Sequence, residues 1–384
     1  MTVLFMVRDW LAPSEVFMSR MVRELEPHVA AIAAWAPQHD LWEGRIPVVA
    51  VRREIGLTRF ARRRGFDVRR RYWSGYKAGT VSKTLAHLGA DTVLIHFLHY
   101  ALEFEQDWAR TNARLFVHCH GYDVTWDEML PGKIPRPAHR PDYTERVRRL
   151  SERATLIANS RATERRLLDI GIKPERIALK YLGVPIQEIS ANKPIGDETS
   201  VLFLGRLVDF KGPDLTIRAF DLACQRGMRG KLVIAGDGWM RAECEALAEA
   251  SRFRDRIQFL GAVDEATGDR LRNQADIFTA HNCKGRVTQQ EEAFGVSIVE
   301  AMAAELPVVS GRSGGLSETV VHEETGLLFE PGDIEAHAAF LLQLAADPAR
   351  RLALGRAGRV RAQEHFSLEQ EKDRLREILE LPRG

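Results

Sequence analysis

The chain has 384 residues, of which 45% are hydrophobic and 28% charged, and its formal net charge is only +2. This composition excludes a mainly disordered or collagen-like protein, and no apolar run approaches the roughly 20 residues of a membrane-spanning helix. Four scattered cysteines and an N-terminus without signal-peptide features predict a protein of the reducing cytoplasm.

Short apolar runs alternate with amphipathic segments along the first half of the chain. The runs predicted as strands span 2–7, 29–35, 46–51, 91–97, 113–121, 155–160 and 177–184. Helices are expected after a loop at 11–15, ending near Leu25, and again over 162–169. Strands and helices that alternate at this spacing are typical of parallel βαβ units.

A polar stretch over 187–200 interrupts this pattern, and the alternation then starts again. The later strands are predicted at 200–206, 231–238, 256–261, 275–281, 306–311 and 325–333, with helices at 213–226, 240–249, before 273 and at 296–304. The sequence therefore predicts an α/β protein with two βα domains. The boundaries are 1–190 for the first domain, 191–199 for the linker, 200–365 for the second domain and 366–384 for a C-terminal helix.

The expected ligand sites are the carboxyl ends of the predicted strands, where open parallel sheets bind their ligands. The chain has no GxxxxGK[ST] motif, and Arg241 stands where the third glycine of a GxGxxG motif would follow Gly236 and Gly238. Standard nucleotide sites of both kinds are therefore disfavoured. The two glycines still indicate a tight turn where a ligand can approach the backbone.

Two cations follow the first strand of the second half. Arg206 comes directly after Gly205, and Lys211 lies just before a predicted helix N-terminus. Fixed cations beside free backbone N–H groups suit a diphosphate. The alternative is that both are solvated surface charges.

Two carboxylates stand eight residues apart in the segment EAFGVSIVEAMA. Glu292 precedes a glycine turn, and Glu300 shares a helix face with apolar residues. A carboxylate on an inward face needs a partner, and a vicinal diol of a sugar would supply one. A Lys or Arg partner on the helix is the alternative. Downstream, Gly314 and Gly315 form a further turn, which is either an anion-binding nest or a plain turn.

Together these segments resemble a retaining, nucleotide-sugar-dependent glycosyltransferase of family 4 with the two-Rossmann GT-B fold. The resemblance rests on VLFLGRLVDFKGPDLTIRAF, LVIAGDG, RIQFLGAV, EAFGVSIVEAMAAELPVVSGRSGGLSETV and TGLLFEPGD, in the order of the family. HGYD, IANSRATERRLLDIGIKPERI and YLGV are family-like in the first half, and LAPSEVFMSRMVREL is similar to the opening loop of exopolysaccharide and colanic-acid enzymes. Glu305 departs from the family, which usually has glycine there as a helix cap.

The resemblance implies two domains that face each other across a cleft, with the C-terminal helix packed toward the first domain. Arg206 and Lys211 would hold the donor diphosphate, Glu292 the transferred sugar and Glu300 the ribose, while His120 would orient the reacting sugar. No cofactor or metal is expected. The further donor residues are Gly205, Gly236, Gly238, Gly261, Val263, Phe294, Gly295, Gly314 and Gly315, and the acceptor side would include Ser14 and Asp123.

Alternatives remain for the first-domain residues. His120 is otherwise a structural histidine, and Asp123 a helix cap. His118 and His120 form a pair that lacks a third metal ligand in the sequence.

The implied function is transfer of a hexose from a UDP- or GDP-linked sugar to a saccharide or polyprenyl-diphosphate-linked acceptor in cell-surface polysaccharide synthesis. Two alternatives stay open: a nucleotide-sugar 2-epimerase of the same fold, and a non-catalytic sugar-nucleotide-binding subunit. Donor hydrolysis or transfer by the purified protein separates the last of these from an enzyme.

Basic charge is concentrated in the first half. Residues 51–83 hold 11 basic and two acidic side chains, interleaved with aromatic residues. This pattern favours binding to the anionic inner face of the cytoplasmic membrane. A nucleic-acid partner is not expected, since no groove-reading element accompanies the segment. The alternative is a solvated basic helix face.

Overall fold

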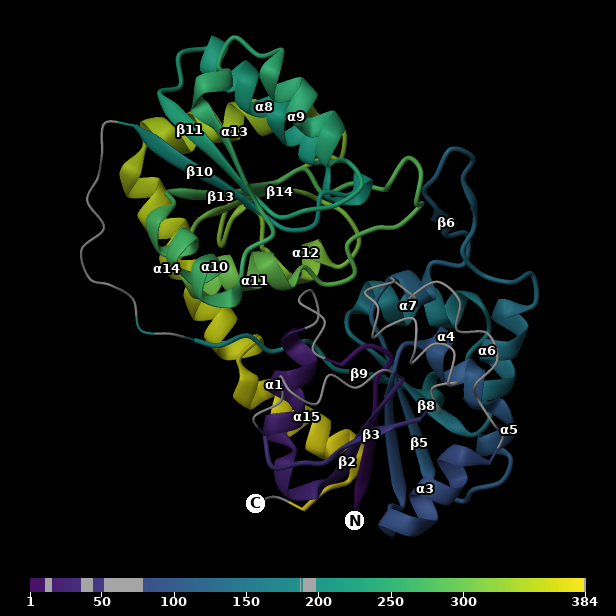
Figure 1. Ribbon diagram of the computed structural model, residues 1–384. Coiled ribbons are helices and arrows are strands. Elements are labelled where there is room, and N and C mark those ends of the chain that lie inside the picture. Colours follow the sequence, from purple (N-terminus) through teal and green to yellow (C-terminus); the bar gives the residue numbers. More distant parts are fainter. Residues whose placement is uncertain (11–15, 36–43, 52–78, 187, 189–197, 383–384) are drawn as a thin grey trace, which may run out of the picture.

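The computed structural model describes residues 1–10, 16–35, 44–51, 79–186, 188 and 198–382. Two parallel sheets form the cores of two domains, and helices pack against each sheet (Figure 1). The predicted α/β fold with two Rossmann-like domains is confirmed.

Within the described residues, the first sheet has the strand order β3-β2-β1-β4-β5-β8-β9, and all its pairs are parallel. Every residue of the central strands β1 and β4 is buried, which explains their continuous apolar runs. Chain order reverses between β1 and β4, so a ligand crevice is expected beside their carboxyl ends. The strands are β1 (Val3–Met6), β2 (Val29–Ala34), β3 (Val48–Ala50), β4 (Thr92–His96), β5 (Arg114–Cys119), β8 (Ala154–Ala158) and β9 (Ile177–Leu179).

The second sheet has the order β12-β11-β10-β13-β14-β15 in the described residues, again with parallel pairs. Chain order reverses between β10 and β13, which places a second crevice at the carboxyl ends of these strands. The strands are β10 (Thr199–Leu204), β11 (Gly230–Ala235), β12 (Ile257–Gly261), β13 (Ile277–Ala280), β14 (Val308–Gly311) and β15 (Leu327–Phe329).

Helices cover both sheets, and the sequence predicted only some of them. The first-domain helices are α1 (Val16–Glu24), α3 (Thr80–Leu88), α4 (Leu98–Ala101), α5 (Glu105–Trp108), α6 (Tyr143–Ser151) and α7 (Arg161–Asp169). Those after β10 are α8 (Pro213–Gln225), α9 (Arg241–Glu249), α10 (Glu265–Gln274), α11 (Val296–Ala303), α12 (Leu316–Thr319), α13 (Ile334–Ala346), α14 (Pro348–His365) and α15 (Leu368–Leu379). A small hairpin, β6 (Met129–Leu130) and β7 (Arg136–Pro137), also went unpredicted.

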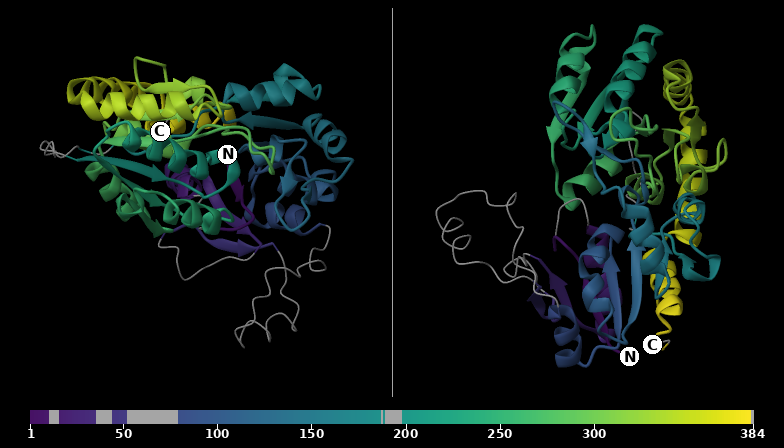
Figure 2. Two further views of the ribbon diagram at one scale, coloured as in Figure 1. Left: turned by 90° about the horizontal axis from the view of Figure 1, so that it is seen from above. Right: turned by 90° about the vertical axis from the view of Figure 1, so that its right-hand side faces the viewer.

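The last helices join the two domains. In Figure 2 the yellow helices α14 and α15 run along one side of both domains, and α15 packs against α1. The Lys180 ammonium donates to the Glu371 carboxylate of α15, and both side chains are buried. An outer pair joins Lys372 to Glu24 at 3.5 Å. The end of the chain is thus fastened to the first domain by an inner and an outer ion pair.

Glu305 adopts the left-handed conformation that the sequence led us to expect of a glycine. Its φ is 56°, and the N–H of Leu306 donates to the carbonyl of Ala301 at 3.0 Å across the end of α11. The glutamate therefore closes the helix with the family's glycine geometry and accepts the strain of a positive φ.

Candidate active site

The carboxyl ends of the two sheets face each other, and their loops touch. A Cβ built on Gly121, after β5, would lie 2.7 Å from the Cβ of Ala293, in the loop before α11. Gly121 has a φ of 120°, so glycine is required there on two grounds. The HGYD and EAFG segments therefore meet in space, although more than 160 residues separate them.

Arg206, Lys211 and Glu292 lie together at the edge of the second sheet. Lys211 donates to Glu292, and the side chains are 13% and 11% exposed. The guanidinium of Arg206 and the ammonium of Lys211 lie 5.5 and 5.8 Å from the ring centre of Phe210. Arg206 is exposed to solvent, whereas Lys211 is already neutralised by a carboxylate. Among the residues that the structure describes, Arg206 has no carboxylate partner, whereas Lys211 is paired with Glu292.

The glycine turns that follow the strands of the second domain pack with their backbones in direct contact. A Cβ on Gly236 would lie 1.9 Å from the carbonyl oxygen of Gly205, and one on Gly238 would lie 2.3 Å from that of Leu207. The N–H of Gly236 donates to the carbonyl of Gly261 at 2.7 Å. These glycines let strand-end turns approach closely, and Val263, half-buried, follows in the same region.

A hydrogen bond within the site favours the plain turn over the anion nest at Gly315. The N–H of Gly315 donates to the carbonyl of Glu292 at 2.8 Å, so it is not free to bind an anion. A Cβ on Gly314 would lie 2.0 Å from that same oxygen. The turn instead supports the loop that carries Glu292. On that loop, the N–H of Gly295 donates to the Glu292 carboxylate at 3.1 Å, and the Phe294 ring is buried against Tyr181 and Phe366.

Glu300 has guanidinium partners. One carboxylate oxygen accepts from Arg20 of α1 at 3.1 Å, and the other lies 3.2 Å from a guanidinium nitrogen of Arg272. Arg20 also donates to Glu265. Glu300 therefore has the cationic partners that the sequence analysis gave as the alternative, and one of them, Arg20, belongs to the first domain. Arg20 lies within the family-like segment LAPSEVFMSRMVREL but was not singled out there, and no motif marked Arg272.

A loop that the sequence left without a role bridges the domains. Residues 283–291 are held by Asp209, whose carboxylate accepts from the N–H groups of Val287 and Thr288 at 2.7 and 2.8 Å. The carbonyl of Thr288 accepts from Met129 of the first domain at 3.2 Å. Glu291 pairs with Arg166 at 2.6 Å. Asp209 stands between Arg206 and Lys211 in the sequence. This position was the one feature that could have indicated that Asp209 holds the loop 283–291.

Asp123 is not on an accessible acceptor face, which corrects the expectation. Its fully buried carboxylate accepts from the backbone N–H groups of Leu98, His120 and Gly121 at 2.9, 2.9 and 3.0 Å. Burial raises its pKa to about 6. The side chain shapes the turn after β5, in a role close to the capping alternative. Ser14, the other acceptor-side residue, lies outside the described residues.

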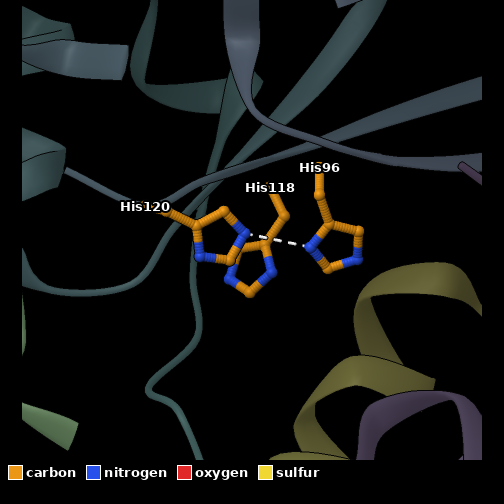
Figure 3. Close-up of side chains that lie close together, drawn as sticks. All are labelled: His96, His118 and His120. Atoms are coloured by element: carbon orange, nitrogen blue, oxygen red, sulfur yellow. Dashed lines mark hydrogen bonds between the residues drawn. The ribbon is translucent and has the colours of Figure 1, made fainter. Parts of the chain in front are cut away.

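His120 points into the first domain rather than toward Glu292. Its Nε2 lies 2.9 Å from Nδ1 of His96, and its Nδ1 is buried without a hydrogen-bond partner among the described residues (Figure 3).

Buried histidines make the fold sensitive to acid. Burial lowers the pKa of His96 and His99 to about 3 and that of His281 to about 4, and those of His118, His120 and His337 lie well below the ordinary value. Below about pH 6.5 these imidazoles bind protons in the unfolded chain but stay neutral in the folded protein. As the pH falls further, each such histidine lowers the free energy of unfolding by about 1.4 kcal/mol per pH unit, until the pH reaches its pKa in the folded protein.

We therefore expect the Tm to fall steeply between pH 6.5 and 5. The raised pKa values of Asp123 and Asp214 act in the opposite direction as the pH falls, but these are two carboxyl groups against six imidazoles. Differential scanning calorimetry at half-unit steps from pH 7.5 measures the effect. A Tm that stays level or rises on acidification contradicts the burial of neutral imidazoles.

Two family models match adjoining parts of the chain. The model for Glycosyltransferase Family 4 matches residues 15–188, and the model for Glycosyl transferases group 1 matches residues 185–361. A GDP-mannose-dependent alpha-(1-6)-phosphatidylinositol monomannoside mannosyltransferase of Mycolicibacterium smegmatis is 30% identical over 277 residues, covering 69% of this chain and 70% of that protein. This chain belongs to the family 4 glycosyltransferases. The prediction of an enzyme that transfers glycosyl groups is confirmed.

Further similarities agree with a GT-B glycosyltransferase. The amylovoran biosynthesis glycosyltransferase AmsK of Erwinia amylovora is 26% identical, covering 68% of this chain and 62% of that protein. The structure of Anabaena HepE with UDP and glucose superimposes with a TM-score of 0.75 over 99% of both chains, at 21% identity. Sucrose-phosphate synthase of Thermosynechococcus elongatus gives 0.78 over 99% of this chain and 98% of that one, at 20% identity. Within the described ranges, no helix of the glycosyltransferase is long and apolar enough to cross a bilayer.

Proposed function

We propose that this glycosyltransferase moves a hexose from a UDP- or GDP-linked sugar to a saccharide or polyprenyl-diphosphate-linked acceptor, with retention of configuration. The observation that carries the proposal is the grouping of Arg206, Lys211 and Glu292 at the edge of the second sheet. The Mycolicibacterium smegmatis relative is GDP-mannose-dependent, and HepE binds UDP and glucose, which supports a nucleotide sugar as the donor.

The Lys211–Glu292 pair suggests how the donor completes the site. A diphosphate carries more negative charge than one carboxylate, so it competes with Glu292 for the Lys211 ammonium. The released carboxylate is then free to accept hydrogen bonds from hydroxyls of the transferred sugar. Arg206 and Lys211 stabilise the charge that develops on the leaving diphosphate, and this step needs no metal at the donor.

Glu300 would bind the ribose by a similar exchange. Its carboxylate is shared by Arg20 and Arg272, so ribose hydroxyls must displace at least one guanidinium contact. Because Arg20 belongs to the first domain, nucleotide binding is expected to loosen a contact between the domains. The backbone around Gly261 and Val263 would meet the base, in keeping with the expectation from the sequence.

The acceptor would bind on the first domain, with His120 turned toward the reacting sugar. AmsK acts in amylovoran biosynthesis, and the Mycolicibacterium smegmatis relative is named for a phosphatidylinositol-linked mannoside. These relatives support a saccharide or lipid-linked saccharide acceptor in cell-surface polysaccharide synthesis, reached from the cytoplasm.

The donor and the stereochemistry are tested on the purified chain. We expect UDP or GDP, and the matching sugar nucleotides, to raise the Tm, since a ligand at 100 times its Kd adds about 2.7 kcal/mol of stability. ADP is the control nucleotide. NMR of the product then reports the anomeric configuration. Inversion would overturn the retaining mechanism, and release of a 2-epimer without transfer would favour the epimerase.

We also propose that the basic segment over 51–83 docks the enzyme on the anionic inner face of the cytoplasmic membrane. Residues 52–78 lie outside the described residues, so the proposal rests on their sequence alone. At about 1 kcal/mol for each basic residue near the surface, five or six contacts suffice for reversible binding. We expect co-sedimentation with anionic vesicles at low salt, weakened by added salt. Equal pelleting with neutral vesicles contradicts it.

A further inference from the structure

Three imidazoles from two neighbouring strands meet inside the first domain. His96 ends β4 and lies in register with His118 of β5, and His120 follows two residues later on the same face. Figure 3 shows the three rings turned toward one another. The sequence placed only His118 and His120 together, because the pairing of β4 with β5 brings in the third ring.

Most ring nitrogens in this cluster have no hydrogen-bond partner among the residues that the structure describes. One nitrogen from each of the three rings can be chosen so that all three lie within 4.8 Å of one another. Apart from the contact between His96 Nδ1 and His120 Nε2, the remaining ring nitrogens are buried and make no hydrogen bond within the described residues. Buried polar atoms are rarely left unpaired, so these nitrogens call for a partner other than the described residues.

The chemistry of the cluster selects the class of partner. Its potential ligands are three imidazoles, each with a ring nitrogen that can bind a metal ion in the neutral form. Phe5 and Phe17 pack against the rings, with centroids 4.6 Å from His96 and 5.0 Å from His120. The nearby Lys180 charge is neutralised by Glu371. A dry site with nitrogen ligands suits zinc, copper or nickel and disfavours magnesium and calcium.

We propose that His96, His118 and His120 form a binding site for a zinc-class transition-metal ion. Zinc–nitrogen bonds are about 2.0–2.1 Å long, so the three rings must rotate to bring their nitrogens closer to one another than they are now. The bound ion takes the nitrogen of His120 that now faces His96 and holds that ring inside the domain. The three histidines belong to the first domain and Arg206 and Lys211 to the second, so the ion is not proposed as a ligand of the donor diphosphate. Because the ion holds His120 inside the domain, metal binding and the turned His120 of the proposed function exclude each other.

Zinc binding to the full chain tests the site directly. The protein is stripped with a chelator, exchanged into chelator-free buffer and titrated with Zn²⁺ against a chromophoric competitor. We expect one equivalent to bind with submicromolar Kd and His118→Gln to weaken it at least 100-fold. His87→Gln, which removes an exposed imidazole on α3, should leave the binding unchanged.

X-ray absorption at the zinc edge is a second test, which uses only the wild-type protein and so does not require His118→Gln to fold. The wild-type spectrum should show three imidazole ligands at about 2.0–2.1 Å. Absence of stoichiometric binding, equal affinity in a folded His118→Gln variant, or a spectrum with fewer than three imidazoles would overturn the site. In that case water is the partner of the buried nitrogens.

Discussion

Replacing Arg206 or Lys211 by alanine lowers kcat/KM for the sugar nucleotide by about 10²–10³-fold, the scale of losing one preorganised charge contact to a transition state. Both cations flank the Phe210 ring at the carboxyl edge of the second sheet, where the leaving diphosphate is expected. The effect should lie largely in kcat, because negative charge on the leaving group increases as the glycosidic bond breaks. Steady-state kinetics with the donor identified by thermal shift measures it.

Arg218→Ala is the matched control, because it removes an exposed arginine from the adjoining helix α8. Its kcat/KM should match that of the wild type. Lys211→Ala also leaves Glu292 without its cation, so the double variant with Glu292→Ala is needed to apportion the loss. Near-wild-type kinetics in both single variants would contradict the assignment of the diphosphate to this site.

Most of the sheet framework was predictable because parallel strands buried on both faces are continuous apolar runs. Every strand of the two large sheets in the described residues overlaps a predicted run, although β8, β10 and β11 each begin one residue before theirs. Two runs were predicted much too long. The run 325–333 contains only the short strand β15. The strand β9 ends at Leu179, because the chain leaves the sheet and Val184 pairs with Ser367 beside α15. The hairpin of β6 and β7 carries no apolar alternation, which explains why the sequence did not reveal it.

Contacts between distant segments were not predictable. The grouping of Arg206, Lys211 and Glu292 followed from strand ends that meet at one edge of a sheet. The Arg20–Glu300 contact depends on how the domains dock, which no single sequence displays. Asp123 turned inward, where its carboxylate accepts from three backbone N–H groups, and no pattern in the sequence displays these contacts.

Replacing Lys180 by methionine should destabilise the enzyme by about 3–5 kcal/mol, because Glu371 is left buried without its cation. The side chains of this pair are 0% and 3% exposed, and the pair fastens α15 to the first domain. For a domain of this size the loss lowers Tm by roughly 10 °C, measured by calorimetry on the full chain. Lys372→Met is the matched control: it breaks the outer pair with Glu24, whose members are 34% and 29% exposed, and should cost less than about 1 kcal/mol.

The double variant Lys180→Met with Glu371→Leu separates an unpaired charge from lost packing. Replacing both members by apolar side chains removes the buried charges together, and such exchanges are often neutral or stabilising. We therefore expect the double variant to recover most of the lost Tm. If it is as unstable as Lys180→Met alone, packing at this position governs the attachment of α15. If Lys180→Met and Lys372→Met lower the Tm equally, the inner pair is no more important than the outer one.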